Sequence, residues 1–95
     1  MTPRRLSEDE VKERLAALPG WSRSDDTISR SYSCQSYTAA CALLVRAAFA
    51  AERLDHHPDV VWRYREVTFT LSTHDAGGLS QLDFDLAAAL DAIFS

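Results

Sequence analysis

Apolar residues near the start of the chain follow the period of a helix. Residues three or four positions apart share one helical face, and those with this spacing are Val11, Leu15 and Leu18. Ser7 and Glu10 precede this run with the spacing of a capping box, the pattern that begins many helices. Pro19-Gly20 then stops the run. The pattern predicts a first helix between Ser7 and Pro19.

Two pairs of segments alternate between apolar and polar residues, which is the period of a half-buried strand. The first pair covers residues 21–24 and 28–34, on either side of a short turn. The second pair covers residues 60–65 and 67–72, with Arg65-Glu66 at the turn. Each pair predicts an antiparallel hairpin.

An alanine-rich stretch from Ser36 to Leu54 separates the hairpins and predicts a second helix, which Pro58 prevents from continuing. Its apolar residues form one stripe and also extend beyond it. The stripe consists of Tyr37, Cys41, Leu44, Ala48 and Ala51, and it is widened by Ala40, Val45, Ala47 and Phe49. One side is expected to pack on the sheet, and the remaining small-residue surface could be covered by a partner helix.

A second capping pattern follows the loop at residues 75–78. Ser80 and Asp83 have the spacing of a capping box, and the flanking Leu79 and Phe84 can pack against each other. A third helix is expected to continue from there nearly to the end of the chain. Its predicted buried residues are Leu82, Leu86, Leu90 and Ile93.

The predicted order α-β-β-α-β-β-α makes an α+β fold, an antiparallel four-stranded sheet with three helices packed on one face. A chain of 95 residues has room for one hydrophobic core, so residues 1–95 are expected to form a single domain. Such a chain buries only about 60–65% of its unfolded surface, and self-association would bury more. A homo-oligomer is therefore expected.

Charge and composition argue against two classes of partner. With 10 basic and 14 acidic residues the net charge is −4, and no Lys/Arg cluster could neutralise a row of phosphates, which disfavours nucleic-acid binding. No apolar run is long enough to span a membrane, and residues 1–10 lack the apolar core of a signal peptide. A cytoplasmic protein is expected. Cys34 and Cys41 lack metal or redox spacing and are expected to be small core residues.

The three histidines stand where elements are expected to end. His56 and His57 follow the second helix, and His74 follows the fourth strand. Histidine both donates and accepts protons near neutral pH, so this grouping points to acid-base chemistry. Glu52 precedes His56 by one helical turn and is expected to orient its ring. A solvated helix end is the simpler explanation of the histidine pair taken alone.

A metal site is the other interpretation of these side chains. Three imidazoles with a carboxylate from Glu52, Asp55 or Asp75 match the ligands of zinc or iron. Adjacent His56 and His57 would point about 100° apart on a helix and would not converge on one ion. The expectation is that no metal is bound.

The spacing of these residues resembles the signature of the pterin-4a-carbinolamine dehydratases. The matching run is Glu52-x-x-x-His56-His57-Pro58, followed at fixed separations by Tyr64, His74 and Asp83. The loop Thr73-His74-Asp75-Ala76-Gly77-Gly78-Leu79-Ser80 is also similar to the family's loop, and the likeness extends from residue 6 to residue 93. Arg65 departs from the pattern, since family members usually have Asn there.

The resemblance implies a hydro-lyase that removes water from 4a-hydroxytetrahydropterin to give quinonoid dihydropterin, which recycles the pterin cofactor of aromatic amino-acid hydroxylases. It implies no cofactor and a homodimer or homotetramer. The implied catalytic residues are His56, His57 and His74, and the implied substrate-binding residues are Glu52, Asp55, Thr73 and Asp75. Tyr64 and Asp83 are expected instead to be structural, as a strand aromatic and a helix-capping carboxylate.

Two other functions stay open. The resemblance also implies that some members act as dimerisation partners of a transcription factor through the second helix, and that other branches serve molybdenum-cofactor metabolism. The spacing does not distinguish the acid from the base among the three histidines.

Overall fold

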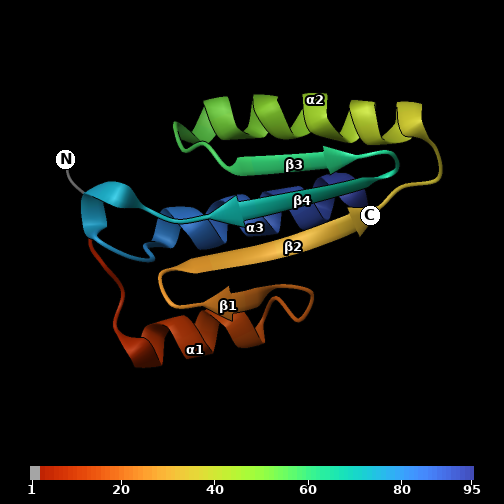
Figure 1. The fold of residues 1–95 in the computed structure, drawn as a ribbon. Coiled ribbons are helices and arrows are strands. Elements are labelled where there is room, and N and C mark those ends of the chain that lie inside the picture. The colour runs from red at the N-terminus through yellow and green to blue at the C-terminus, as the bar shows by residue number, and fades with distance from the viewer. Residues whose placement is uncertain (1–2) are drawn as a thin grey trace.

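The computed structural model describes residues 3–95 and contains the seven predicted elements together with a short 3₁₀-helix, η1. In chain order the elements are α1 (Glu8–Ala16), β1 (Ser22–Ser24), β2 (Thr27–Ser33), α2 (Tyr37–Leu54), β3 (Asp59–Arg63), β4 (Glu66–Leu71), η1 (His74–Ala76) and α3 (Gln81–Phe94). Figure 1 shows their arrangement. The predicted order and the α+β class are confirmed.

The four strands form one sheet in the order β1-β2-β4-β3, and every neighbouring pair is antiparallel. Ile28 pairs with Leu71 and Tyr32 pairs with Val67, so these side chains point to the same face of the sheet. That face is buried. The opposite face is polar, and there the Ser31 and Thr68 hydroxyls hydrogen-bond across the strands.

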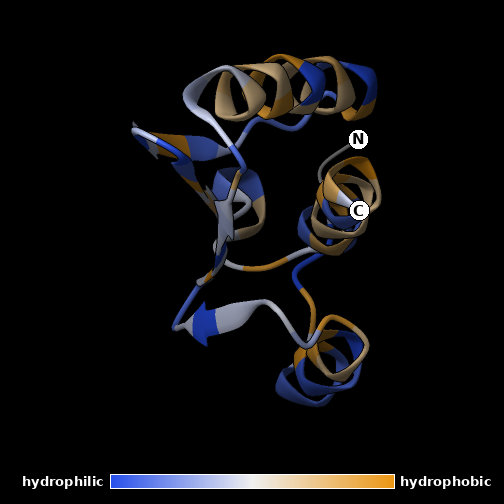
Figure 2. Ribbon diagram, turned by 90° about the vertical axis from the view of Figure 1, so that its right-hand side faces the viewer, coloured by the Kyte–Doolittle hydropathy of each residue, from blue (hydrophilic) through white to orange (hydrophobic). Residues whose placement is uncertain are grey.

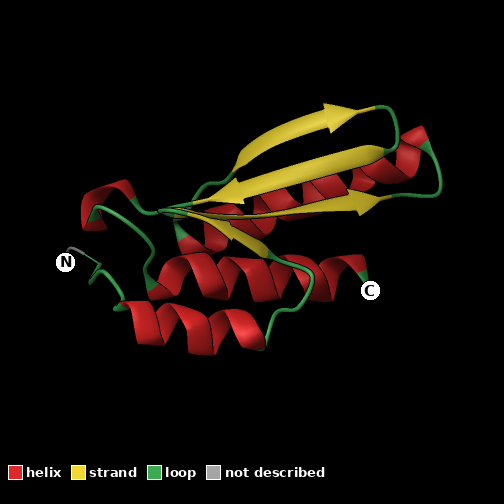
Figure 3. Cartoon of the chain, turned by 60° about the horizontal axis from the view of Figure 1, so that its bottom comes forward, coloured by secondary structure: helices red, strands yellow, loops and turns green. Residues whose placement is uncertain are grey.

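The helices cover the buried face of the sheet, as Figures 2 and 3 show from two directions. In Figure 1, α2 follows the edge strand β3, α3 crosses behind the central strands, and α1 lies beside β1. Ile28, Phe69 and Leu86 have no exposed surface in the core between these layers. Burial of apolar side chains such as these is the main stabilising contribution, about 1.5–3 kcal/mol for each large residue.

Both predicted capping boxes are present. The Glu10 amide donates to Ser7 Oγ and the Ser7 amide donates to Glu10 Oε1 at the start of α1. At the start of α3, the Ser80 hydroxyl accepts from the Leu82 amide, and the Asp83 carboxylate accepts from the Ser80 amide. Each box satisfies backbone amides that have no partner inside the helix, and this is why both helices begin where the pattern places them.

The turn between β3 and β4 differs from the predicted one. Arg63 pairs with Glu66, so the loop is Tyr64-Arg65 and not Arg65-Glu66. Tyr64 has a left-handed φ of 52° and its side chain is 69% exposed, so the prediction of a strand aromatic is wrong. The alternation of apolar and polar residues predicted a strand position for Tyr64, because Tyr64 lies two residues after Trp62. The strand, however, ends at Arg63.

The buried face of α2 is not the predicted stripe. Its buried residues are Ala40, Leu43, Ala47, Ala50 and Ala51. Of the predicted stripe, Ala51 is buried, Leu44 is half-buried, and Tyr37, Cys41 and Ala48 are exposed. Ala40 and Ala47, which were predicted to widen the stripe, are buried. A face made mostly of alanine lets a helix approach its neighbours closely, so the larger side chains turn outward. The prediction of a buried Cys41 is therefore wrong, and Cys34 is only half-buried.

The third helix matches its pattern more closely. Leu86 and Leu90 are fully buried, whereas Leu82 and Ile93 are half-buried near the two ends of α3. Within residues 3–95, no helix combines the length and the apolar character needed to cross a membrane.

Candidate active site

A left-handed residue ends α2 and separates the directions of the two adjacent histidines. Asp55 has a φ of 51°, and its amide donates to the carbonyls of Ala51 and Glu52. Aspartate is among the few residues other than glycine that adopt this conformation readily. The His56 amide then donates back to the Ala51 carbonyl at 3.0 Å, which closes the helix end. Pro58 follows, and the chain enters β3.

His56 turns inward and meets a buried carboxylate. Its Nε2 lies 2.6 Å from Asp83 Oδ1, and Asp83 has no exposed surface. The other Asp83 oxygen accepts from the Thr73 hydroxyl at 2.7 Å and from the Ser80 amide at 2.9 Å. Asp83 therefore caps α3 as predicted and also contacts a predicted catalytic residue. The capping pattern gave no signal of this second contact.

His57 turns outward and meets an exposed carboxylate. Its Nε2 lies 2.8 Å from Glu52 Oε2, with 59% of the His57 side chain and 77% of the Glu52 side chain exposed. The prediction that Glu52 orients His56 is therefore wrong. Helical spacing would have paired Glu52 with His56, but the left-handed Asp55 ends the helix before that residue.

The third histidine lies in the segment that follows β4. His74 begins η1, and the turn closes where the Gly77 amide donates to the His74 carbonyl at 3.0 Å. Gly77 has a φ of 70°, a conformation that glycine adopts without strain. Thr73 and Gly78 bridge the base of this loop. His74 and Asp75 are both exposed at its surface.

These segments line an open cavity of about 270 Å³. Six of the seven predicted site residues line it, namely Asp55, His56, His57, Thr73, His74 and Asp75, and the other lining residues are Pro3, Ser72 and Leu82. Glu52 reaches the cavity only through its hydrogen bond to His57. The Thr73 hydroxyl contacts Asp83 and Ser80, so it is occupied within the protein.

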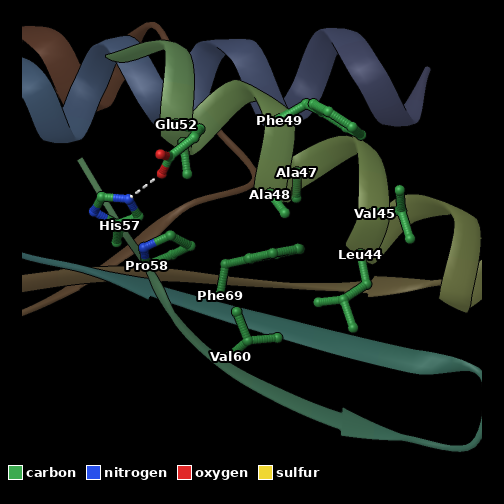
Figure 4. Close-up of a pocket in the computed structure, with 11 residues that line it drawn as sticks. Leu44, Val45, Ala47, Ala48, Phe49, Glu52, His57, Pro58, Val60 and Phe69 are labelled. Atoms are coloured by element: carbon green, nitrogen blue, oxygen red, sulfur yellow. Dashed lines mark hydrogen bonds and ion pairs between the residues drawn. The ribbon is translucent and has the colours of Figure 1, made fainter. Parts of the chain in front are cut away.

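An apolar groove of about 490 Å³ adjoins this cavity and shares His57 with it. Figure 4 shows the groove between α2 and the strands. Val60 and Phe69 line the strand side, and Leu44 and Phe49 line the helix side. The Glu52–His57 pair closes one end. The candidate site therefore has a polar cavity and an apolar extension.

The arrangement suits proton transfer. Imidazoles in three different surroundings face one cavity, and imidazole is the side chain most often used for general acid-base catalysis. Within residues 3–95, no group of three or more His, Cys, Asp and Glu side chains is arranged to hold a metal ion.

The fold and the site together define a small α+β domain in which the end of one helix and the loop after one strand bring three imidazoles to a shared cavity. The family model described as Pterin 4 alpha carbinolamine dehydratase matches residues 4–93. A relative in Nocardia farcinica, which carries that enzyme's name provisionally, is 52% identical over 93 residues, 98% of each chain. The chain belongs to the pterin-4-alpha-carbinolamine dehydratase family.

Two solved structures are similar. One is described as a transcriptional coactivator/pterin dehydratase from Brucella melitensis, with a TM-score of 0.93 and 37% identity over 97% of this chain and 100% of that chain. The other is a pterin dehydratase-like protein identified as a RuBisCO assembly factor in the alpha-carboxysome. Its TM-score is 0.66, with 20% identity over 79% of this chain and 87% of that chain. At that identity the second likeness shows the fold alone.

Proposed function

We propose that this protein catalyses the dehydration of a 4a-hydroxytetrahydropterin to the quinonoid dihydropterin. The observation that carries the proposal is the convergence of His56, His57 and His74 on one cavity in a chain of this family. The cavity, about 270 Å³, is slightly smaller than the roughly 300–1,000 Å³ that is usual for small-molecule sites. Asp55 and Asp75 at its rim supply acceptors for a polar heterocycle.

The reaction divides into two proton transfers. The lone pair on N5 expels the 4a-hydroxyl group, so an acid protonates the leaving oxygen and a base removes the N5 proton, and the products are water and the quinonoid dihydropterin. Positioned imidazoles contribute about 10²–10⁴-fold to such steps. The three histidines are our candidates for the acid and the base, with Glu52 holding His57 in place.

The direct test is a stopped-flow assay of carbinolamine loss. The substrate is generated in the cell of the instrument by a pterin-dependent hydroxylase, and its decay is followed with and without this protein. We expect the wild-type protein to accelerate the decay, and chelator-treated protein to do so equally. No acceleration by the wild-type protein would refute the dehydratase activity.

We infer that the reaction recycles the cofactor of an aromatic amino-acid hydroxylase in the cytoplasm. Cys34 and Cys41 are both free, as thiols are in a reducing compartment. A hydroxylase in the same cell would support this assignment. A member serving molybdenum-cofactor metabolism would be retained in cells without a hydroxylase.

We also propose a homo-oligomer whose contact is the exposed face of α2. Antiparallel pairing of two copies about Val45 would set Phe49 opposite the small Cys41, and Ala48 opposite Ala42. All five residues are exposed in the single chain. This apolar face also favours the second candidate function, a protein-binding role in which another protein takes the place of the second copy.

A further inference from the structure

Asp83 is a fully buried carboxylate whose two oxygens have different partners. Oδ2 accepts from the Ser80 amide at 2.9 Å and from the Thr73 hydroxyl at 2.7 Å. Among residues 3–95, the one hydrogen-bond partner of Oδ1 is the ring of His56, through Nε2 at 2.6 Å. Asp83 is 27 residues from His56 in sequence, so the contact joins the start of α3 to the end of α2.

The directions of these hydrogen bonds follow from the chemistry of the groups. A backbone amide can only donate, and an ionised carboxylate can only accept. The Ser80 hydroxyl accepts from the Leu82 amide and donates to Thr73 Oγ1, which leaves the Thr73 proton for Asp83 Oδ2. Both donors on this side are therefore fixed. The remaining oxygen, Oδ1, needs a donor, and in the described part of the chain this donor is the Nε2–H of His56.

The other ring nitrogen of His56, Nδ1, is the one that can exchange a proton with a ligand. Among residues 3–95, Nδ1 has no hydrogen-bond partner. Every fully buried side-chain nitrogen or oxygen in this part of the chain does have a partner. Nδ1 is therefore not sealed inside the protein. His56 is 9% exposed and lines the polar cavity, so this small exposed area is on the side where a ligand would bind.

We propose that Asp83 is a positioning residue that holds neutral His56 as the Nε2–H tautomer, so that Nδ1 is its proton-accepting atom. When Nδ1 takes a proton from a ligand, the ring becomes an imidazolium and the Asp83 carboxylate, already 2.6 Å away, balances its charge. The proton later leaves Nδ1 to solvent, and the ring returns to its starting tautomer. The catalytic consequence of this arrangement rests on the proposed dehydratase function.

The substitution Asp83→Asn tests the proposal because it replaces the acceptor that faces His56 with a hydrogen-bond donor. Ser80 and Thr73 still require an acceptor at the Oδ2 position, so the amide oxygen stays there and the amide NH₂ faces His56. Nε2 must then accept, and the ring proton moves to Nδ1. Long-range ¹H–¹⁵N spectra of the imidazole rings identify the protonated nitrogen directly. We expect Nε2–H in the wild-type protein and Nδ1–H in the variant.

The kinetic expectation is a fall in kcat of about 10²-fold or more for Asp83→Asn, with KM little changed, because the basic nitrogen now faces away from the ligand. Glu10→Gln is the matched control, since Glu10 fills the same capping-box position in α1 and does not line the cavity. We expect Glu10→Gln to keep both the His56 tautomer and the rate. A purely structural role for Asp83 would give the two variants the same kinetics.

An Nδ1–H tautomer in the wild-type protein would overturn the proposal, and so would an unchanged tautomer in folded Asp83→Asn. If Asp83→Asn does not fold, the wild-type spectrum alone decides. The spectra do not depend on turnover, so failure of the dehydratase assay leaves the tautomer measurement intact. Failure of the tautomer prediction in an active enzyme, conversely, removes only the role of Asp83.

Discussion

The Nε2 atom of His57 lies 2.8 Å from Oε2 of Glu52, five residues earlier in the chain. In a continuous helix, Glu52 would instead face the residue four positions on. The left-handed backbone of Asp55 ends α2 and carries His57 round to the Glu52 side while His56 turns into the core. One backbone conformation therefore gives two neighbouring histidines opposite surroundings.

Glu52→Ala is expected to lower the rate of carbinolamine dehydration by less than His57→Ala does. The pair is exposed, so losing Glu52 frees the ring without removing the acid-base group, which itself contributes about 10²–10⁴-fold. Stopped-flow rates of Glu52→Ala, Glu52→Gln and His57→Ala check this order. Glu52→Gln can still hydrogen-bond the ring and is expected to keep more activity than Glu52→Ala. Equal rates for all three variants and the wild-type protein would mean that the pair is a surface contact only.

The three histidines are expected to differ in their effect on stability. His57 and His74 are exposed, so replacing either with Ala should lower the rate and leave the thermal midpoint within a few degrees. His56→Ala leaves Asp83 Oδ1 buried without a partner and should reduce the free energy of unfolding by about 1–3 kcal/mol. Urea denaturation of the three variants measures the difference. Equal losses of stability in all three would contradict the different surroundings described above.

Local features of the fold were predictable because they depend on residues close in sequence. The capping boxes that begin α1 and α3, and the alternation in β2 and β4, follow from spacing alone. The convergence of the three histidines was predicted from the places where a helix and a strand end, since the ends of elements at one edge of a sheet lie near each other. These features located the cavity correctly.

The partners within the site were not predictable in the same way. Whether Glu52 meets His56 or His57 depends on the φ of Asp55, and a periodic pattern has no information about a single left-handed residue. The His56–Asp83 contact joins positions 27 residues apart and depends on how α2 and α3 are packed. An apolar surface left exposed on α2 was expected, but the residues that face the sheet were predicted wrongly, because alanine is apolar and packs equally well inward or outward.

Tyr64→Asn is expected to stabilise the fold by up to about 1 kcal/mol. An aromatic residue in the left-handed region carries a steric cost that asparagine largely avoids. Arg65→Asn is the control, since Arg65 occupies the adjacent turn position without a positive φ. Urea midpoints of both variants measure the effect, and a gain at Arg65 but not at Tyr64 would contradict the turn as described.

Phe49→Glu is expected to dissociate the proposed oligomer. Light scattering of the wild-type protein should give at least twice the 10.6 kDa of one chain, and the variant should give one chain mass. Phe49 is 70% exposed on α2, so a glutamate there costs the single chain little. Val61→Glu is the matched control, because Val61 is 58% exposed but lies on β3. Dissociation by Val61→Glu alone would place the contact at the edge strand instead.

Glu10 is expected to make stability depend on acid pH. Its hydrogen bonds with the Arg4 guanidinium and then with the Ser7 amide lower the pKa of Glu10 from 4.5 to about 2. The folded pKa lies below the unfolded one, so this stabilisation is fully present above pH 4.5 and is lost as the pH falls through about 2. Glu10→Gln lacks the charge at every pH.

The urea midpoints of the wild-type protein and Glu10→Gln should therefore differ at pH 7 and converge as the pH approaches 2. Glu8, whose pKa is also lowered by its hydrogen bonds with Arg23, is present in both proteins, so its contribution cancels from the comparison. Salt should reduce the difference at pH 7, because the Arg4–Glu10 pair is exposed. A difference that persisted below pH 2 would show that the substitution acts through packing at the start of α1, and not through the charge of Glu10.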